Sequence, residues 1–392
     1  MEGPPPMTPT TPAPATPAAE PDLLYSEEED ALRAAVRALL ADRADPATVL
    51  AAVETGRPCD PELWHALTAG IGAAGLLVPE ELGGQGAGPR EAAVVLEELG
   101  RAVAPLPYLT SAVLAVTALL GCDTGRPEVA GPLAALAEGR TVGALAVPLP
   151  TAPGGTGPAT VRADAAGALT GRITSVADAP GAGLLLVPAD GPDGPALHAV
   201  NAAADGVRIE PVTPLDLTRP LAHVVLDGAA GRPLAHGERA RAAVERALRT
   251  GAGLLASEQL GLAEWCLTET VRYTRERTQF GRPVGSFQAL KHRMAALWLD
   301  VAAARAAARN AADALAGDTP DAPVAVAVAQ AFCAPVAVRA AEECIQLHGG
   351  IGMTWEHPAH LFLKRAKSDE LALGTPGRHR AALAGLVDLA AP

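Results

Sequence analysis

Aromatic side chains are scarce in this sequence of 392 residues: they make up 3% of it, although 49% of the residues are hydrophobic. A large core must therefore be built from leucine, valine and alanine, and small alanine side chains allow helices to approach closely. Cysteine is also scarce, and no two of the five residues form a CxxC pair. This spacing predicts small buried side chains in a reducing compartment, rather than disulfides or a metal site. The five are Cys59, Cys122, Cys266, Cys333 and Cys344.

Positive charge is in deficit, with 31 lysines and arginines against 44 aspartates and glutamates and a net charge of −13. This balance argues against nucleic acid or an anionic membrane as the main partner. No run of about 18 apolar residues lacks a charge, so no membrane span is expected. Residues 1–22 are a proline, threonine and alanine tract without the basic and apolar segments of a signal peptide, and we expect them to be disordered. The chain is expected to be cytoplasmic.

The texture of the sequence changes twice. Residues 23–138 show helical periodicity that begins after a predicted N-cap at Ser26. Residues 139–235 are short apolar runs separated by Gly, Pro, Asp and Asn, which is typical of an antiparallel β domain. Residues 236–392 contain long helical segments at 238–278, 286–316 and 322–348 that suit a four-helix bundle. We therefore predict an α+β multidomain fold in the order helical, β, helical. No GxGxxG follows a strand, which argues against a Rossmann domain.

A basic island in this acidic chain is the first candidate site. It lies in RYTRERTQFGRPVGSFQALKHRMA, residues 272–295. Such a group could bind a phosphate and stack an adenine, or it could be a solvated helix end that complements the helix dipole. Its members are Arg275, Arg277, Arg282 and Lys291, around Phe280 and Gln288.

Two further stretches carry backbone features that suit a ligand. In QLHGGIGMTWEHP, Gly349, Gly350 and Gly352 permit positive φ and close approach, and they also suit a helix C-cap. In GTPGRHR, Thr375 and Pro376 form a good N-cap and N1 pair. The helix that they begin could present its free N–H groups to an anion, or the pair could be a cap alone.

Together these stretches resemble the acyl-CoA dehydrogenase family over about residues 23–390. The similarity also covers LLVPEELGGQGAGPREAAVVLEELGRAVAPLP and continues to LFLKRAK. The resemblance implies two helical domains around a β domain, FAD as cofactor, and oxidation of an acyl-CoA thioester to the 2,3-enoyl-CoA. In that chemistry a glutamate removes the α-proton while the β-hydride goes to the flavin.

The same resemblance indicates that catalytic parts are missing. The common position of the family's base, directly before Gly374-Thr375, is Leu373. The other position used in the family falls on Gly251, with Ala252 where an Arg is expected. The β domain has AVPLPTAPGG in place of the Thr-Glu-Pro flavin motif, and GRITSVAD lacks the family's Trp.

Other family positions are retained, and in the family they reach across a subunit interface to a neighbour's FAD. The chain therefore resembles the base-lacking subunit of heteromeric members, which completes a partner's flavin site. No metal ligand set is expected. The flavin contacts that the resemblance implies are Arg277, Gln279, Phe280, Gln288, Gln346, Gly349, Gly350 and Thr375.

Three alternatives stay open at this level. A self-sufficient acyl-CoA dehydrogenase could use a displaced base, with Glu370, Asp369 and Glu258 as candidates. A flavin monooxygenase on the same fold would need no such base, and a purely structural role would need no flavin. The sequence names neither the acyl group nor a partner chain, and it leaves homo- and hetero-oligomers open.

Overall fold

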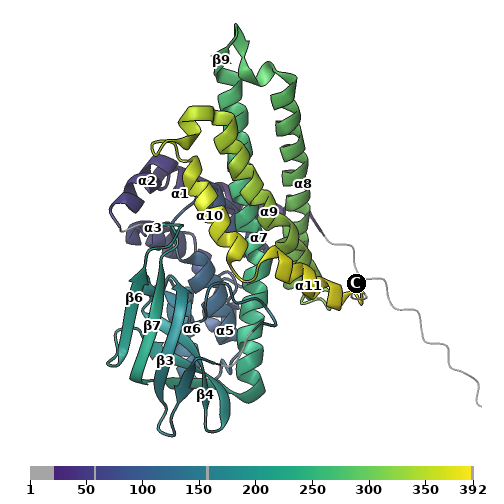
Figure 1. The fold of residues 1–392 in the computed structure, drawn as a ribbon. Coiled ribbons are helices and arrows are strands. Elements are labelled where there is room, and N and C mark those ends of the chain that lie inside the picture. The colour runs from purple at the N-terminus through teal and green to yellow at the C-terminus, as the bar shows by residue number, and fades with distance from the viewer. Residues whose placement is uncertain (1–21, 57–58, 156–158, 390–392) are drawn as a thin grey trace, which may run out of the picture.

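The computed structural model describes residues 22–56, 59–155 and 159–389, so the tail predicted at 1–22 lies outside it apart from Asp22. Two helical parts lie on either side of the chain's β-sheet in sequence (Figure 1). The predicted α+β class and the order helical, β, helical are confirmed. The exact domain boundaries, at residues 138 and 235, stay predictions.

The N-terminal helical part begins where the capping residues predict. The hydroxyl of Ser26 accepts a bond from the Glu29 N–H, and the Glu29 carboxylate accepts one from the Ser26 N–H, which satisfies two free donors of the first turn. Two π-helical turns, at Ala66–Gly70 and Tyr108–Ala115, interrupt the regular helices. The α-helices of the N-terminal part are α1 (Glu27–Arg43), α2 (Pro46–Glu54), α3 (Pro61–His65), α4 (Pro89–Arg101), α5 (Val116–Leu120) and α6 (Pro127–Ala137).

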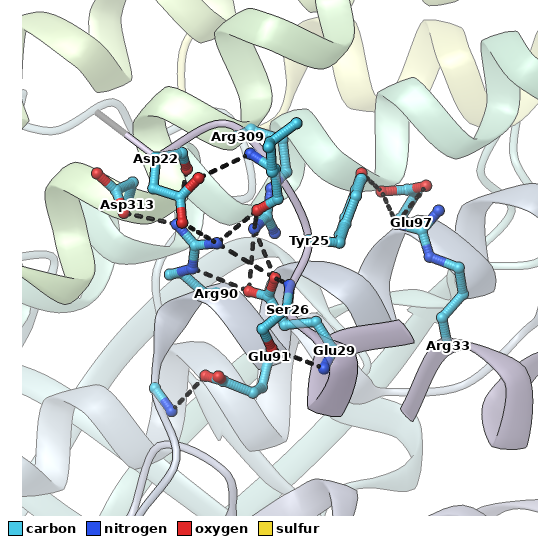
Figure 2. A network of polar contacts seen from close by, with 12 residues as sticks. Asp22, Tyr25, Ser26, Glu29, Arg33, Arg90, Glu91, Glu97, Arg309 and Asp313 are labelled. Atoms are coloured by element: carbon cyan, nitrogen blue, oxygen red, sulfur yellow. Dashed lines mark hydrogen bonds and ion pairs between the residues drawn. The ribbon is translucent and has the colours of Figure 1, made fainter. Parts of the chain in front are cut away.

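An arginine clamp ties α1 and α4 to α8 (Gln288–Ala316) of the C-terminal part (Figure 2). Arg309 of α8 donates to both carboxylate oxygens of Glu29, at 2.9 and 2.8 Å. Arg90 of α4 donates to Glu29 at 2.9 Å and to Asp313 of α8 at 2.7 Å. The Glu29 and Arg309 side chains are each 1% exposed, so neither charge has water as an alternative partner. The clamp therefore fixes the two helical parts to each other.

A second carboxylate of this region, Glu97 of α4, has an unusual environment. It accepts a 2.7 Å bond from the Tyr25 hydroxyl, and Arg33 lies 3.3 Å away (Figure 2). Burial, and next the nearby carboxylate of Glu264, raises the pKa of Glu97 to about 7. The folded protein therefore binds a proton at Glu97 more tightly than the unfolded chain does.

This raised pKa predicts a pH-dependent loss of stability. The stabilisation from the proton on Glu97 is complete below the unfolded pKa of about 4.5, and is lost as the pH rises to about 7. The Glu97→Gln variant lacks this titration, so relative to it the wild type should lose about 3 kcal/mol between those limits. Urea unfolding of both proteins at pH 5 and 8 measures the change. Glu81→Gln, at an exposed position, is the control and should show the same pH dependence as the wild type. The prediction is contradicted if the difference in unfolding free energy between the wild type and Glu97→Gln is the same at pH 5 and pH 8.

The described residues form one large sheet of eight strands and a small two-stranded one. The large sheet has the order β6-β7-β3-β2-β4-β5-β8, with β1 paired to β4. Most pairs are antiparallel, as predicted, but β1 and β2 run parallel to β4. A short apolar run has the same pattern in either orientation, so the sequence did not reveal this. The strands are β1 (Gly143–Leu145), β2 (Val161–Ala163), β3 (Ala168–Ala177), β4 (Leu184–Gly191), β5 (Gly194–Asn201), β6 (Val207–Val212), β7 (Leu221–Ala230) and β8 (Arg232–His236).

Strand β4 shows how the sheet joins the rest of the protein. Its side chains alternate between two cores, because successive residues of a strand point to opposite faces. Leu184 and Leu186 belong to the large core shared with the helices, whereas Leu185 and Val187 belong to a separate core on the other face. The sheet is therefore buried on both faces at its centre.

The C-terminal part is built around α7 (Gly237–Glu276), a helix of 40 residues. Its middle third is almost wholly buried against α4, α8 and α9 (Ala322–His348). The hairpin of β9 (Thr278–Gln279) and β10 (Arg282–Pro283) caps the end of α7 that lies far from the sheet (Figure 1). The remaining helices are α10 (Ala359–Leu371) and α11 (Pro376–Leu386).

Within the part of the chain that the structure describes, one helix is long and apolar enough to cross a membrane, by length and composition alone. It covers α9 and the turn after it, residues 322–353, and 67% of its most apolar window is buried inside the protein. Burial of this kind is what a core helix of the bundle requires, so the apolar composition already has a use within the fold.

Candidate functional site

The two positions that the resemblance assigns to the family's base, Leu373 and Gly251, lie side by side. A Cβ atom added to Gly251 of α7 would lie 3.1 Å from Leu373 Cδ1 and 2.4 Å from Leu114 Cδ2. Leu373 is 1% exposed and Ala252 is wholly buried. The two residues that were reached by separate counts along the sequence are therefore neighbours in space. The side chains around them are apolar and closely packed. None of them can accept a proton.

A loop from the sheet also covers this place. Leu373 has a φ of +53°, and its N–H donates to the Leu149 carbonyl at 2.8 Å. A Cβ atom on Gly374, whose φ is +104°, would lie 2.7 Å from Ala152 Cβ. The predicted departure AVPLPTAPGG is this same loop. Because it occupies the backbone donor of Leu373, that N–H is not free to polarise a substrate carbonyl.

Two of the three displaced-base candidates, Glu258 and Asp369, lie in a buried ion network. Arg219 donates to both oxygens of Glu258, at 2.7 and 2.8 Å, and also pairs with Asp369. Arg365 of α10 donates to Glu258 at 2.6 Å. Each of these side chains is at most 4% exposed. Burial, and next the charge of Glu258, raises the pKa of Asp369. Both oxygens of Glu258 are therefore paired with guanidinium groups, whereas Asp369 pairs through one oxygen and its Oδ2 has no hydrogen-bond partner among the described residues.

The network also includes the loop between β6 and β7. Arg365 donates to Asp216 at 2.7 Å, to the Thr218 hydroxyl at 2.6 Å and to the Thr218 carbonyl at 2.9 Å. It thus joins the sheet to α7 and α10. Sequence reasoning missed Arg219, Arg365 and Asp216. A buried arginine has no local signature, and the partners are up to 150 positions apart.

The third candidate, Glu370, lies on the outer side of α10. It accepts a 2.9 Å bond from Lys367, three residues earlier, and its side chain is 27% exposed. An i, i+3 pair of this kind is an ordinary feature of a helix surface. Nothing in this arrangement aims Glu370 at Leu373.

The predicted flavin contacts divide into two groups. Seven are exposed and gather at the end of the bundle far from the sheet, where Tyr273 of α7 stacks on His348 of α9 with ring centroids 4.3 Å apart. They are Arg277, Gln279, Phe280, Gln288, Gln346, Gly349 and Gly350. The eighth, Thr375, caps α11 beside Leu373, where its hydroxyl accepts from the Arg378 N–H at 3.3 Å.

Helix geometry sets the distance between these groups. Gly251, which contacts Leu373, lies within α7, and Arg277 is the C-cap of the same continuous helix. A helix rises about 1.5 Å per residue, so 26 residues separate them by about 39 Å. An extended FAD molecule is much shorter than this. The exposed group and the Leu373 position of one chain therefore cannot serve the same flavin.

The exposed group has the donors and the space for an anionic cofactor. Gly349 has a φ of +64°, and a Cβ atom on either Gly349 or Gly350 would meet nothing within 4 Å. Phe280 is 90% exposed. An uncovered aromatic ring, a guanidinium at Arg277 and an open glycine turn suit an adenine and a pyrophosphate.

A cavity of about 630 Å³ opens between the sheet and the start of α7, and sequence reasoning did not find it. Ile173, Pro188 and Val244 are among its lining residues, and Arg241 and Asp190 are the charged side chains among the described residues there. The size and largely apolar lining suit a small organic ligand. The cavity does not reach Leu373, which is absent from its lining.

Comparisons with known proteins agree with the fold. Residues 26–134 match the model of the acyl-CoA dehydrogenase N-terminal domain, and residues 241–385 match that of the C-terminal domain. Acyl-CoA dehydrogenase IpdE2 of Mycolicibacterium smegmatis is 39% identical over 90% of this chain and 96% of its own length. The fold and these matches define a flavoprotein dehydrogenase of the α, β, α type. The chain belongs to the acyl-CoA dehydrogenase family, whose cofactor is FAD.

Solved structures give the same result. The ChsE4-ChsE5 complex from Mycobacterium tuberculosis contains a chain with a TM-score of 0.83 and 31% identity, over 95% of this chain and all of that one. A variant of the Tcur3481-Tcur3483 steroid ACAD has a TM-score of 0.81 and 31% identity, over 92% of this chain and 98% of that one. The first is a complex of two named proteins, and the name of the second also joins two proteins.

Proposed function

We propose that this chain is the base-lacking subunit of a heteromeric acyl-CoA dehydrogenase and completes the FAD site of a partner subunit. The meeting of Leu373, Gly251 and Leu114 carries the proposal, because the family's chemistry requires a carboxylate there. Removal of the α-proton from a thioester needs a base on one face of the substrate, opposite the hydride acceptor. That base is then supplied by the partner. FAD, when bound, accepts the hydride.

The exposed group supplies this chain's contribution. Arg277 would pair with the pyrophosphate, the N–H groups of the glycine turn would donate to it, and Phe280 would pack on the adenine. The separation of about 39 Å along α7 supports a flavin whose ring lies in the partner. An exposed arrangement is what a site that is completed only in the complex requires.

The alternatives have less support. The arginine pairs of Glu258 and Asp369 argue against a self-sufficient enzyme with a displaced base. The relatives named above are acyl-CoA dehydrogenases, which gives the monooxygenase no support. The Tcur3481-Tcur3483 complex is described as a steroid ACAD, and we extend that substrate class, a steroid-derived acyl-CoA, to this chain. The five cysteines are free, which favours a reducing compartment such as the cytoplasm.

The test is the flavin content of the chain purified alone and purified with an acyl-CoA dehydrogenase encoded beside it. We expect a colourless lone chain and a complex that holds one FAD for every two chains. The complex should oxidise a steroid-derived acyl-CoA. One FAD per subunit in the lone chain, with dehydrogenation, would overturn the proposal.

The Arg277→Ala variant tests the contact across the interface. A hydrogen bond to a charged group contributes about 1.5–3 kcal/mol, so its loss should weaken FAD binding by the complex about tenfold or more. Equilibrium dialysis with absorbance detection measures this.

Arg246→Ala is the matched control, since Arg246 is also an exposed arginine of α7 but lies near the other end of the helix, outside the basic island and the predicted contacts. It should leave FAD binding unchanged. Equal losses of FAD affinity in both variants would mean that only the overall positive charge matters. Unchanged FAD affinity in Arg277→Ala would show that Arg277 does not contact the cofactor.

A further inference from the structure

Three potential metal ligands gather beneath the glycine turn, and none belongs to the predicted flavin contacts. They are Glu269 of α7, His348 at the end of α9, and His357, which precedes α10. One ligand atom of each lies within 4.8 Å of the others. Side chains from three separate elements thus converge on one point.

His348 is oriented as a metal ligand would be. Its side chain is 0% exposed, and its Nε2 has no hydrogen-bond partner among the described residues. Its Nδ1 lies 2.6 Å from the Cys344 carbonyl, which can only accept, so Nδ1 carries a proton. In the neutral ring Nε2 then has a free lone pair, aimed toward Glu269. Metal-bound histidines commonly donate their other N–H to a backbone carbonyl in this way.

The spacing is wide for hydrogen bonds and close to that of a coordination sphere. His348 Nε2 lies 3.8 Å from Glu269 Oε1, beyond hydrogen-bond reach. Zinc holds its nitrogen and oxygen ligands at about 2.0–2.2 Å, so two tetrahedral ligand atoms are about 3.4 Å apart. A small rotation of each side chain would therefore admit an ion. His357 would exchange the long 3.2 Å bond from the Ala359 N–H for the metal.

The charges around the cluster are compatible with a cation. Arg272 donates to Glu269 at 2.8 Å and to Glu276 at 2.7 Å, so two carboxylates share one guanidinium. Arg272 donates to both oxygens of Glu269, and hydrogen bonds of this kind favour the ionised form of a carboxylate. His357 is only half-buried, which leaves room for a water as fourth ligand.

We propose that Glu269, His348 and His357 form a Zn²⁺ site. The ion joins the end of α7 to both sides of the turn at Gly349–Met353. It therefore fixes the turn that contributes Gly349 and Gly350 to the exposed group. The sequence predicts no metal site, because its cysteine spacing matches none and these three ligands lie up to 88 positions apart.

Calorimetric titration of the chelator-treated full chain with Zn²⁺ at pH 7.5 tests the site without any need for flavin or activity. We expect one ion per chain, with at least tenfold weaker binding in His357→Ala and in Glu269→Gln. Co²⁺ in place of Zn²⁺ should give the intense visible bands of a four-coordinate site. His360→Ala is the matched control: His360 stacks on Trp355, outside the cluster, and its loss should leave the binding unchanged.

A direct ion pair is the competing arrangement. In it His348 is protonated on both nitrogens and faces Glu269, as a pKa of about 9 for His348 would allow. It predicts no stoichiometric binding of Zn²⁺ and an Nε2 proton, visible by NMR, that persists with Zn²⁺ present. Either result, or equal losses in His357→Ala and His360→Ala, would overturn the zinc site. Circular dichroism shows whether each variant is folded. If His357→Ala does not fold, the Zn²⁺ affinity of Glu269→Gln tests the site instead.

Discussion

Arg365→Met is expected to lower the free energy of unfolding by about 3–5 kcal/mol, the usual cost of breaking a buried ion pair from one side. Methionine keeps much of the length of the side chain but removes every bond to Asp216, Thr218 and Glu258. Asp216 and Glu258 then stay buried with fewer partners, and their desolvation is no longer offset. Urea unfolding, with the slope compared between variant and wild type, measures the loss.

The control for this variant is Arg246→Met on α7, an exposed arginine with no ion pair among those found in the described residues. Surface changes of this kind usually stay within about 0.5 kcal/mol. A loss of under about 1 kcal/mol in Arg365→Met would contradict the prediction, because it would mean that Arg365 does not offset the desolvation of Asp216 and Glu258. A changed slope instead would indicate that the sheet separates from α7 before the rest unfolds.

Local signals in the sequence identified the ends of elements well. Ser26 and Thr375 cap helices because each side-chain oxygen accepts from an N–H three residues on, a contact decided within one turn. The parallel pairing of β1 with β4 depends on residues about 40 positions apart. Periodicity contains no information on such a pair, so it could be found only from the structure.

The candidate site divides in the same way. Counting along the family motifs picked out Leu373 and Gly251, and the structure brings these two residues into contact; their assignment to the base positions stays a prediction. The reason that the place is closed, the bond from the Leu373 N–H to Leu149, comes from a loop more than 200 positions away. The arginine partners of Glu258 and the Glu269 cluster are long-range in the same sense. A carboxylate looks alike in sequence whether it is free, paired with arginine or facing a histidine.

Leu373→Glu, which introduces a glutamate at the position that the resemblance assigns to the family's base, is expected to destabilise the lone chain without creating an enzyme. The new carboxylate would be buried against Leu114 and Gly251, with no cation among the contacts described there. An unpaired buried charge should cost at least about 3 kcal/mol at pH 8. Burial raises the pKa of such a group, so the cost should be smaller at pH 5, where the carboxyl is protonated, and should grow as the pH rises.

Two variants at the same position separate charge from shape. Leu373→Gln is isosteric with the glutamate but does not titrate, so its loss of stability should not change between pH 5 and 8. Leu373→Met keeps the volume and should cost under about 1.5 kcal/mol. All three replacements have a Cβ atom, so the positive φ at position 373 affects them alike. A Leu373→Glu chain that keeps wild-type stability at pH 8, or that binds FAD and oxidises an acyl-CoA alone, would mean that the loop at Leu149 opens. The chain would then have its own flavin and substrate site, and the carboxylate would be the one part that the wild type lacks.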